Sequence, residues 1–184
     1  MAADLPPLHV LTSAILELES FVNEDGWDQP ARLFAMAPAA ELLRSEPALA
    51  EAMGLDPNLE DSDVLIPVEQ VEWPAEDIDI DEALARISWP DQVVGVAITL
   101  ERLLLPPSAE ADLDDEAELS ELLEQAIGHP DKREVRLAVA VLRDGRQMCA
   151  IRLRENDSDD EVLTGKDLVP NLTAALAATL TLPD

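Results

Sequence analysis

The sequence predicts an α+β protein, one domain over residues 1–184, with an antiparallel sheet of about four or five strands and helices packed on it. Three observations predict this class. The longest apolar run, residues 89–107, contains a stretch that alternates in the manner of a strand. A second apolar block, residues 135–154, is divided by Asp144 and Gly145 into two halves that are typical of a hairpin. Segments with the helical spacing of apolar residues lie on both sides of these blocks.

Composition narrows the class of protein further. An apolar fraction of 47% in 184 residues is enough to form a core and argues against disorder. The net charge of −28 repels phosphates and anionic lipids, so neither nucleic acid nor a membrane is expected as a partner. Cys149 is the single cysteine, no apolar run is long enough to span a bilayer, and the N-terminus lacks a basic leader. A cytoplasmic location is therefore expected.

The first elements are an amphipathic helix, a turn and a strand. Residues 8–23 have apolar side chains at helical spacing on an inner face, and Glu17, Glu19 and Ser20 are expected on the opposite, polar face. Residues 23–30 have the composition of a turn, and residues 32–37 are predicted as a strand. Pro38 begins a helix to about residue 45, followed by a second short helix that ends at Met53 before Gly54.

The middle of the chain contains acidic loops and two short elements. Residues 64–73 hold a possible strand that Pro67 restricts to a sheet edge. A short helix follows over residues 81–88, with Asp79 or Asp81 as its N-cap. The acidic segments 56–63 and 157–161 lack the glycine that a calcium loop needs for its sharp turn, so we expect solvated loops there.

The strand predicted over residues 93–104 has two unlike faces. Bulky side chains point to one face, namely Val94, Val96, Ile98 and Leu100. Gly95, Ala97 and Thr99 make the middle of the other face small. A helix is expected over residues 114–127, and another over residues 167–180 with Pro170 in its first turn.

The hairpin of residues 134–142 and 146–154 allows two registers. A two-residue turn at Asp144 and Gly145 would place bulky residues on opposite faces of the two strands. A three-residue loop over 143–145, with Gly145 left-handed, would place Val139 and Cys149 together on a bulky face. The second register is preferred, because it separates bulky from small side chains as the first strand does.

The candidate binding site is the small face of this sheet. It combines Gly95, Ala97 and Thr99 with four charged residues at one end, namely Glu101, Arg136, Arg152 and Arg154. Two arginines opposite each other across a ladder repel unless acids lie between them. Glu101, the predicted acidic helix around residues 114–124, or an external anion would supply the acid. Three occupants of the face remain open: a helix of the same chain, a protein partner or second subunit, and a small anionic ligand.

The sequence offers little for catalysis. His9 and His129 are not at metal-ligand spacing with other His or Cys residues, and Cys149 falls on a bulky strand face where a thiol is packing. The six glycines are scattered, so no phosphate-binding loop is present. We therefore expect no catalytic residues, no cofactor and no metal.

The expected function is that of a non-catalytic binding or adaptor protein, with a protein partner or self-association as a homodimer. A chaperone-like role is one form of this expectation. The alternatives are an enzyme of unassigned chemistry that uses carboxylates and arginines, and an acidic mimic of nucleic acid that binds a basic partner.

Four blocks carry a resemblance that covers most of the chain: GWDQPARLFAMAPAAELL (26–43), SWPDQVVGVAITLERLLLPP (88–107), EVRLAVAVLRDGRQMCAIRLR (134–154) and DLVPNLTAALAATL (167–180). Together they resemble an uncharacterised family of acidic, cytosolic actinobacterial proteins. The resemblance implies a compartment and a single domain, and it implies no mechanism.

Overall fold

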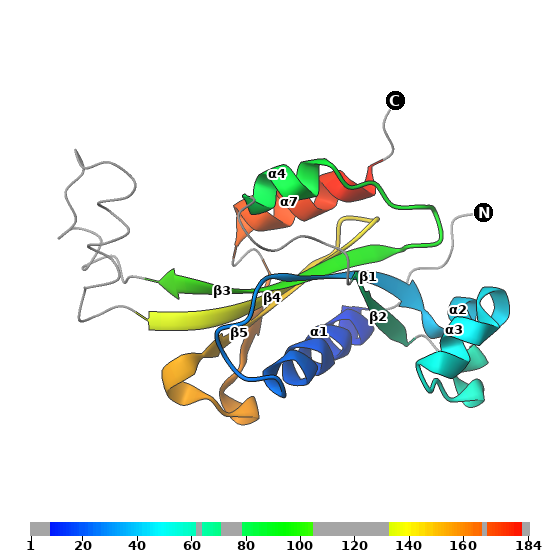
Figure 1. Cartoon of the computed structure of the whole chain (residues 1–184), viewed down its shortest axis with the longest axis horizontal. Coiled ribbons are helices and arrows are strands. Elements are labelled where there is room, and N and C mark those ends of the chain that lie inside the picture. Colours follow the sequence, from blue (N-terminus) through cyan, green and yellow to red (C-terminus); the bar gives the residue numbers. More distant parts are fainter. Residues whose placement is uncertain (1–7, 62–63, 71–78, 105–132, 167–168, 182–184) are drawn as a thin grey trace.

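The computed structural model describes residues 8–61, 64–70, 79–104, 133–166 and 169–181, which form one antiparallel sheet with helices on both faces (Figure 1). The six strands follow the order β2-β1-β3-β4-β5-β6 across the sheet. Their bounds are β1 Arg32–Pro38, β2 Leu65–Glu69, β3 Gly95–Leu104, β4 Arg133–Leu142, β5 Gln147–Leu153 and β6 Leu163–Gly165. The α+β class is confirmed. The expected strand number of four or five is too low, because β6 was not predicted.

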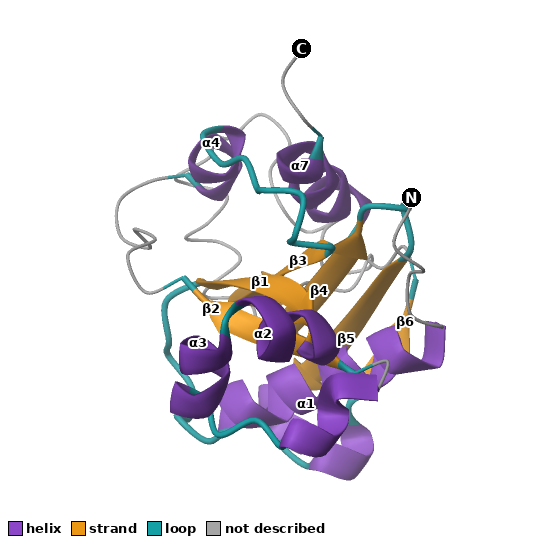
Figure 2. Cartoon of the chain, turned by 90° about the vertical axis from the view of Figure 1, so that its right-hand side faces the viewer, coloured by secondary structure: helices purple, strands orange, loops and turns teal. Residues whose placement is uncertain are grey.

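The helices cover both faces of the sheet. Helix α1 (Leu8–Asn23) lies on one face, and α4 (Ile80–Ala85) and α7 (Pro170–Leu180) lie together on the other (Figures 1 and 2). The short helices α2 (Ala39–Ser45) and α3 (Pro47–Ala52) follow the end of β1. The helix expected over residues 114–127 lies outside the described residues. None of the described helices is both long enough and apolar enough to cross a membrane.

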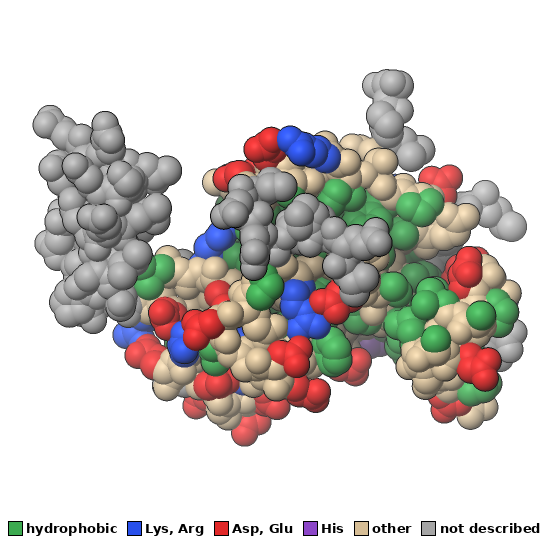
Figure 3. All heavy atoms as spheres, in the orientation of Figure 1, with side chains coloured by type: hydrophobic (Ala, Val, Ile, Leu, Met, Phe, Trp, Pro, Cys, Tyr) green, Lys and Arg blue, Asp and Glu red, His purple; other side chains and the backbone are tan. Residues whose placement is uncertain are grey.

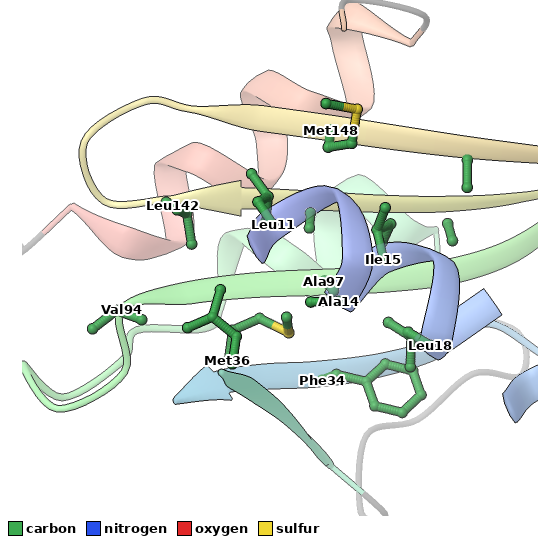
Figure 4. Packing of buried hydrophobic residues seen from close by; sticks show 14 of the residues in the cluster. Leu11, Ala14, Ile15, Leu18, Phe34, Met36, Val94, Ala97, Leu142 and Met148 are labelled. Atoms are coloured by element: carbon green, nitrogen blue, oxygen red, sulfur yellow. The ribbon is translucent and has the colours of Figure 1, made fainter. Parts of the chain in front are cut away.

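The small face of the sheet is covered by α1. Leu11, Ile15 and Leu18 of the helix pack into one core with the small residues Ala97, Ala138, Ala140 and Ala150 of three strands (Figure 4). Small side chains on a sheet allow a helix to approach closely. Of the three occupants considered for this face, the structure shows a helix of the same chain.

The bulky face carries a second core. Val96, Ile98, Leu137, Val139 and Cys149 pack against Leu176 and Leu180 of α7 and Leu84 of α4. Gly95 begins β3 and pairs with Leu142 of β4. A Cβ atom there would lie 2.6 Å from Leu142 Cδ2 and 2.8 Å from the Val141 carbonyl oxygen. Glycine is therefore required at this position by lack of space.

The preferred hairpin register is confirmed. Val139 pairs with Cys149 and Arg136 pairs with Arg152 across β4 and β5. The main-chain N–H of Leu142 donates to the Arg146 oxygen at 2.8 Å, and Gly145 has a φ of +90°. The loop thus contains three residues with a left-handed glycine at its end.

Both edges of the sheet are unsuited to further strand pairing. Main-chain hydrogen bonds flank β2 at both ends: the N–H of Gln70 donates to the Leu33 oxygen, and the N–H of Ala39 donates to the Val64 oxygen. In the register of the two strands, the even-numbered residues of β2 are therefore the ones whose N–H groups point toward β1. The main-chain nitrogen of Pro67, an odd-numbered residue, therefore points away from β1 to the open edge of the sheet. Proline has no N–H to donate there, as expected of an edge strand. At the other edge, β6 is only three residues long. Short edges and outward prolines are the usual protection against intermolecular pairing.

Candidate functional site

Two buried arginines stand side by side at one end of the face that α1 covers. Arg136 of β4 and Arg152 of β5 are direct partners across the ladder, and their side chains are 0% and 1% exposed. Like charges at this separation destabilise a sheet unless acids compensate them. The compensating acids define what we call the arginine centre: Arg136, Arg152, Glu19, Asp157 and Asp159.

Glu19 of α1 is the acid shared by the two arginines. Arg152 donates from Nε and Nη2 to the two carboxylate oxygens of Glu19, each at 2.7 Å, and Arg136 Nη1 lies 3.5 Å from Glu19 Oε1. The expectation that Glu19 lies on the polar face of the helix is wrong, because its carboxylate is only 1% exposed. Glu19 lies at the border of the apolar stripe of α1, and the two hydrogen bonds from Arg152 hold its carboxylate on the buried side.

The segment after β5 closes on Arg152 from the outside. Arg152 Nη1 donates to Asp157 at 2.9 Å, and Nη2 donates to Asp159 at 2.5 Å. The prediction of a solvated loop over residues 157–161 is therefore only half right: these carboxylates touch solvent on one side and Arg152 on the other. The hydrogen bond with Glu19 is the main cause that raises the pKa of Arg152 above its ordinary value, while burial opposes it.

Trp27 packs over the arginine centre. Its indole N–H donates to Asp157 Oδ2 at 3.0 Å, and its ring centroid lies 4.4 Å from Arg136 Cζ and 5.5 Å from Arg154 Cζ. These distances allow cation–π attraction to both guanidinium groups. The hydrogen bond from Trp27 is the main cause that lowers the pKa of Asp157.

Arg136 is held mostly by neutral partners. Its Nη1 donates to Asn23 Oδ1 at 2.8 Å, and its Nη2 donates to the main-chain oxygen of Gly26. In the described part of the chain, two buried side-chain atoms have no hydrogen-bond partner, Arg136 Nε and Thr99 Oγ1. The predicted acid Glu101 lies 3.6 Å from Arg136 Nη2, so it contributes from a distance.

Glu101 has a different main role, which is to hold the turn before β1. Its two carboxylate oxygens accept the main-chain N–H groups of Asp28 and Gln29, each at 2.8 Å. Asp28 has a φ of +65°, a backbone conformation that residues other than glycine seldom adopt. Glu101 therefore anchors a strained turn next to Trp27.

Arg154 forms an outer layer above Trp27. Its guanidinium donates to both oxygens of Asp28 at 2.9 and 3.1 Å and to Glu134 at 3.1 Å. These bonds lower the pKa of Asp28 and raise the pKa of Arg154, with the hydrogen bond between the two as the largest cause in each case. A hollow of about 170 Å³ adjoins this pair. It is lined by Trp27, Asp28, Glu101, Arg102, Leu103, Glu134 and Arg154.

The structure brings the predicted charged residues together at one end of the sheet face that carries the predicted small ones. Gly95, Ala97 and Thr99 are buried beneath α1, and Arg136 and Arg152 are buried with them. Glu101 is half-buried, and Arg154 is the exposed member of the predicted set. Sequence reasoning missed Glu19, Trp27, Asp28, Asp157 and Asp159. The available signal for Trp27 was an aromatic residue inside a turn of a chain with 3% aromatic content.

The acids of the centre do not form a metal site. The guanidinium of Arg152 fills the space on which Glu19, Asp157 and Asp159 converge. Within the described ranges, no three His, Cys, Asp or Glu side chains are grouped so as to hold a metal ion.

The chain matches a known protein family. The model of a family described as "PPA1309-like protein" matches residues 11–181, a range that includes every strand of the sheet and reaches from α1 to the end of α7. No curated protein and no solved structure matches the chain.

Proposed function

The chain belongs to the PPA1309-like protein family, and we propose that it is a non-catalytic cytoplasmic binding or adaptor protein for a basic protein partner. The family description names no activity, so the proposal rests on the site. The partner is expected to dock over the arginine centre, on the surface around Trp27.

One observation carries the proposal: carboxylates at the surface of the arginine centre pair with an arginine and still remain largely exposed to solvent. Asp28 and Asp159 each bond to an arginine, yet their side chains remain 77% and 71% exposed. Exposed Asp and Glu side chains gather over the lower part of the molecule in Figure 3. A negative potential of this kind attracts positively charged partners and speeds their association.

The same contacts speak against a catalytic use of the buried arginines. Arg152 binds three carboxylates, and Arg136 lies beneath the Trp27 ring. A guanidinium that stabilises a reacting group must present its donors to the substrate. The buried centre therefore supports the fold, and the surface above it is left for binding.

The test is binding of a short capped peptide of alternating Arg and Gly, measured by calorimetry at low and high salt. The doubly neutralised variant Asp25→Asn/Asp28→Asn should bind several-fold more weakly, because both acids flank Trp27 in the chain. The matched control is Glu41→Gln/Glu51→Gln, which removes the same charge from α2 and α3. Equal weakening in both variants would show that only net charge matters and would reject the proposed surface.

A second form of the proposal is self-association through α7. This helix contains no charged residue from Pro170 to Leu180, and Asn171, Ala174 and Ala178 are exposed on it. In a chain of net charge −28, a neutral face is where two copies repel each other least. Light scattering of the wild type and of Ala174→Glu tests this form: a dimer that the substitution separates supports it, and a strictly monomeric wild type rejects it.

A further inference from the structure

We propose that Arg154 is an internal placeholder, and that an arginine side chain of the basic partner takes its position when the partner binds. This inference rests on the proposed function and names the chemical group recognised. It concerns the outer layer of the site, where Asp28, Glu134 and Trp27 form a receptor around the Arg154 guanidinium.

The receptor has the geometry that suits a guanidinium. Asp28 accepts two parallel bonds at 2.9 and 3.1 Å, Glu134 accepts a third at 3.1 Å, and the Trp27 ring lies 5.5 Å from Arg154 Cζ. A carboxylate that bonds both ends of the planar fork, with an aromatic ring beside it, distinguishes arginine from lysine. Lysine has only a point charge to offer the same groups.

The receptor remains in place without Arg154. Glu101 fixes the main chain at Asp28, as two bonds of 2.8 Å to the N–H groups of Asp28 and Gln29 show. Trp27 is held from below by Asp157 and Arg136, and Glu134 is part of β4. A site that is already formed costs a ligand little ordering on binding.

Arg154 itself is easily exchanged. Its side chain is 39% exposed, whereas that of Arg152 is 1% exposed and bonded to three carboxylates. Exposed ion pairs stabilise a protein only slightly, so displacing Arg154 costs little, whereas displacing Arg152 would break the core. Arg152, in β5, thus has a structural role, whereas Arg154, directly after β5, can be exchanged.

Two hollows lined in part by Arg154 provide space for the exchange. The hollow of about 170 Å³ lined in part by Trp27, Leu103 and Arg154 is open to an incoming side chain. A second hollow of about 370 Å³ is lined by Arg133, Glu134, Arg154 and Glu155. A displaced Arg154 can turn toward this second hollow, where Glu155 is paired with Arg133.

The experiment uses the full chain and follows the indole N–H signal of Trp27 by NMR while a capped Gly-Gly-Arg-Gly-Gly peptide is added. Trp27→Phe assigns the signal. The variant is Arg154→Ala, and the matched control is Arg86→Ala, which removes a more exposed arginine from its pair with Glu82 of α4. If Arg154 occupies the receptor for about nine-tenths of the time, its removal tightens peptide binding about tenfold relative to the control. The lysine analogue of the peptide should bind more weakly to Arg154→Ala.

Two results would overturn the inference. One is equal affinity of Arg154→Ala and Arg86→Ala for the arginine peptide, because both variants gain the same negative charge. The other is undiminished binding when Asp28→Asn is added to Arg154→Ala, because the peptide would then be bound elsewhere. The first result leaves the wider proposal untouched, since salt-dependent binding of basic peptides to the acidic surface needs no exchange with Arg154. The second result would also count against docking around Trp27.

Discussion

Glu19 and Arg152 form a two-point ion pair inside the protein: both hydrogen bonds are 2.7 Å long, and both side chains are 1% exposed. The pair joins the first helix to the fifth strand across 133 residues of sequence. Its geometry makes the attachment of α1 to the sheet depend on electrostatics as well as on apolar packing.

Glu19→Gln should destabilise the protein by about 3 kcal/mol, the lower end of the range for breaking a buried ion pair. Arg152 keeps Asp157 and Asp159, but Arg136 and Arg152 lose the acid that they share. Urea denaturation measures the change. The control is Glu17→Gln, an exposed neighbour on the same helix that should change stability by less than about 0.5 kcal/mol. Similar midpoints for the two variants would contradict the role assigned to Glu19.

Arg143→Lys should destabilise the end of α7 by about 1–2 kcal/mol, because one guanidinium binds four main-chain oxygens there. Arg143 donates to Val93 at 2.7 Å, to Trp89 and Pro90 at 3.1 and 2.9 Å, and to Leu180 at the C-terminus of α7. A lysine ammonium cannot reach all of these acceptors. Hydrogen exchange in α7 should become faster in this variant, and it should stay unchanged in Arg146→Lys, whose arginine pairs locally with Asp144.

Gly95→Ala should destabilise the protein by about 1–3 kcal/mol through overpacking. The added Cβ would meet the Val141 carbonyl at 2.8 Å, and a main-chain oxygen within a ladder cannot move aside freely. Gly95→Val should be worse than Gly95→Ala in thermal melting. A melting temperature that rises on Gly95→Ala would show that β3 and β4 can separate there at little cost.

Stability should decrease on acidification below pH 4, in part through Asp157. Its pKa is lowered in the folded protein below the ordinary value of 3.8, mainly by the hydrogen bond from Trp27. The unfolded chain therefore takes up this proton first, so the stabilisation is complete above the ordinary pKa and disappears as the pH falls through the lowered one. Denaturation measured as a function of pH should show a shallower acid limb for Asp157→Asn than for Asp160→Asn, an exposed acid of the same segment. Identical acid dependence of stability in the two variants would show that Asp157 does not contribute to the acid sensitivity.

Strand faces and the hairpin register were predictable where the pattern is local. Val94 is an exception: it was expected on the bulky face and packs with α1 in the core of the small face. Alternation in β3 placed Gly95 and Val96 on opposite faces, and the separation of bulky from small residues selected the pairing of Val139 with Cys149. The cap of α4 was also predictable, since Asp79 accepts the N–H groups of Asp81 and Glu82. These features depend on residues that are close in sequence or directly paired.

The arginine centre was only half predictable, because its partners come from separate segments. Arg136 and Arg152 were expected to meet, but a glutamate at the border of a helical face is assigned to solvent unless its partner is known. The positions of Trp27 and Asp157 depend on two loops that meet over the sheet. Strand β6 is three residues long, too short to show a period of two.

The separation of Glu19 from Arg152 also has a consequence for how the chain is made. Glu19 leaves the ribosome early, and its guanidinium partner follows only after 133 more residues. Until then α1 has no completed strands β4 and β5 to pack on. Contacts this distant in sequence slow folding, so we expect α1 to dock late, after nearly all of the chain has been synthesised. During that interval the apolar stripe of α1 is the surface that a ribosome-bound chaperone would encounter.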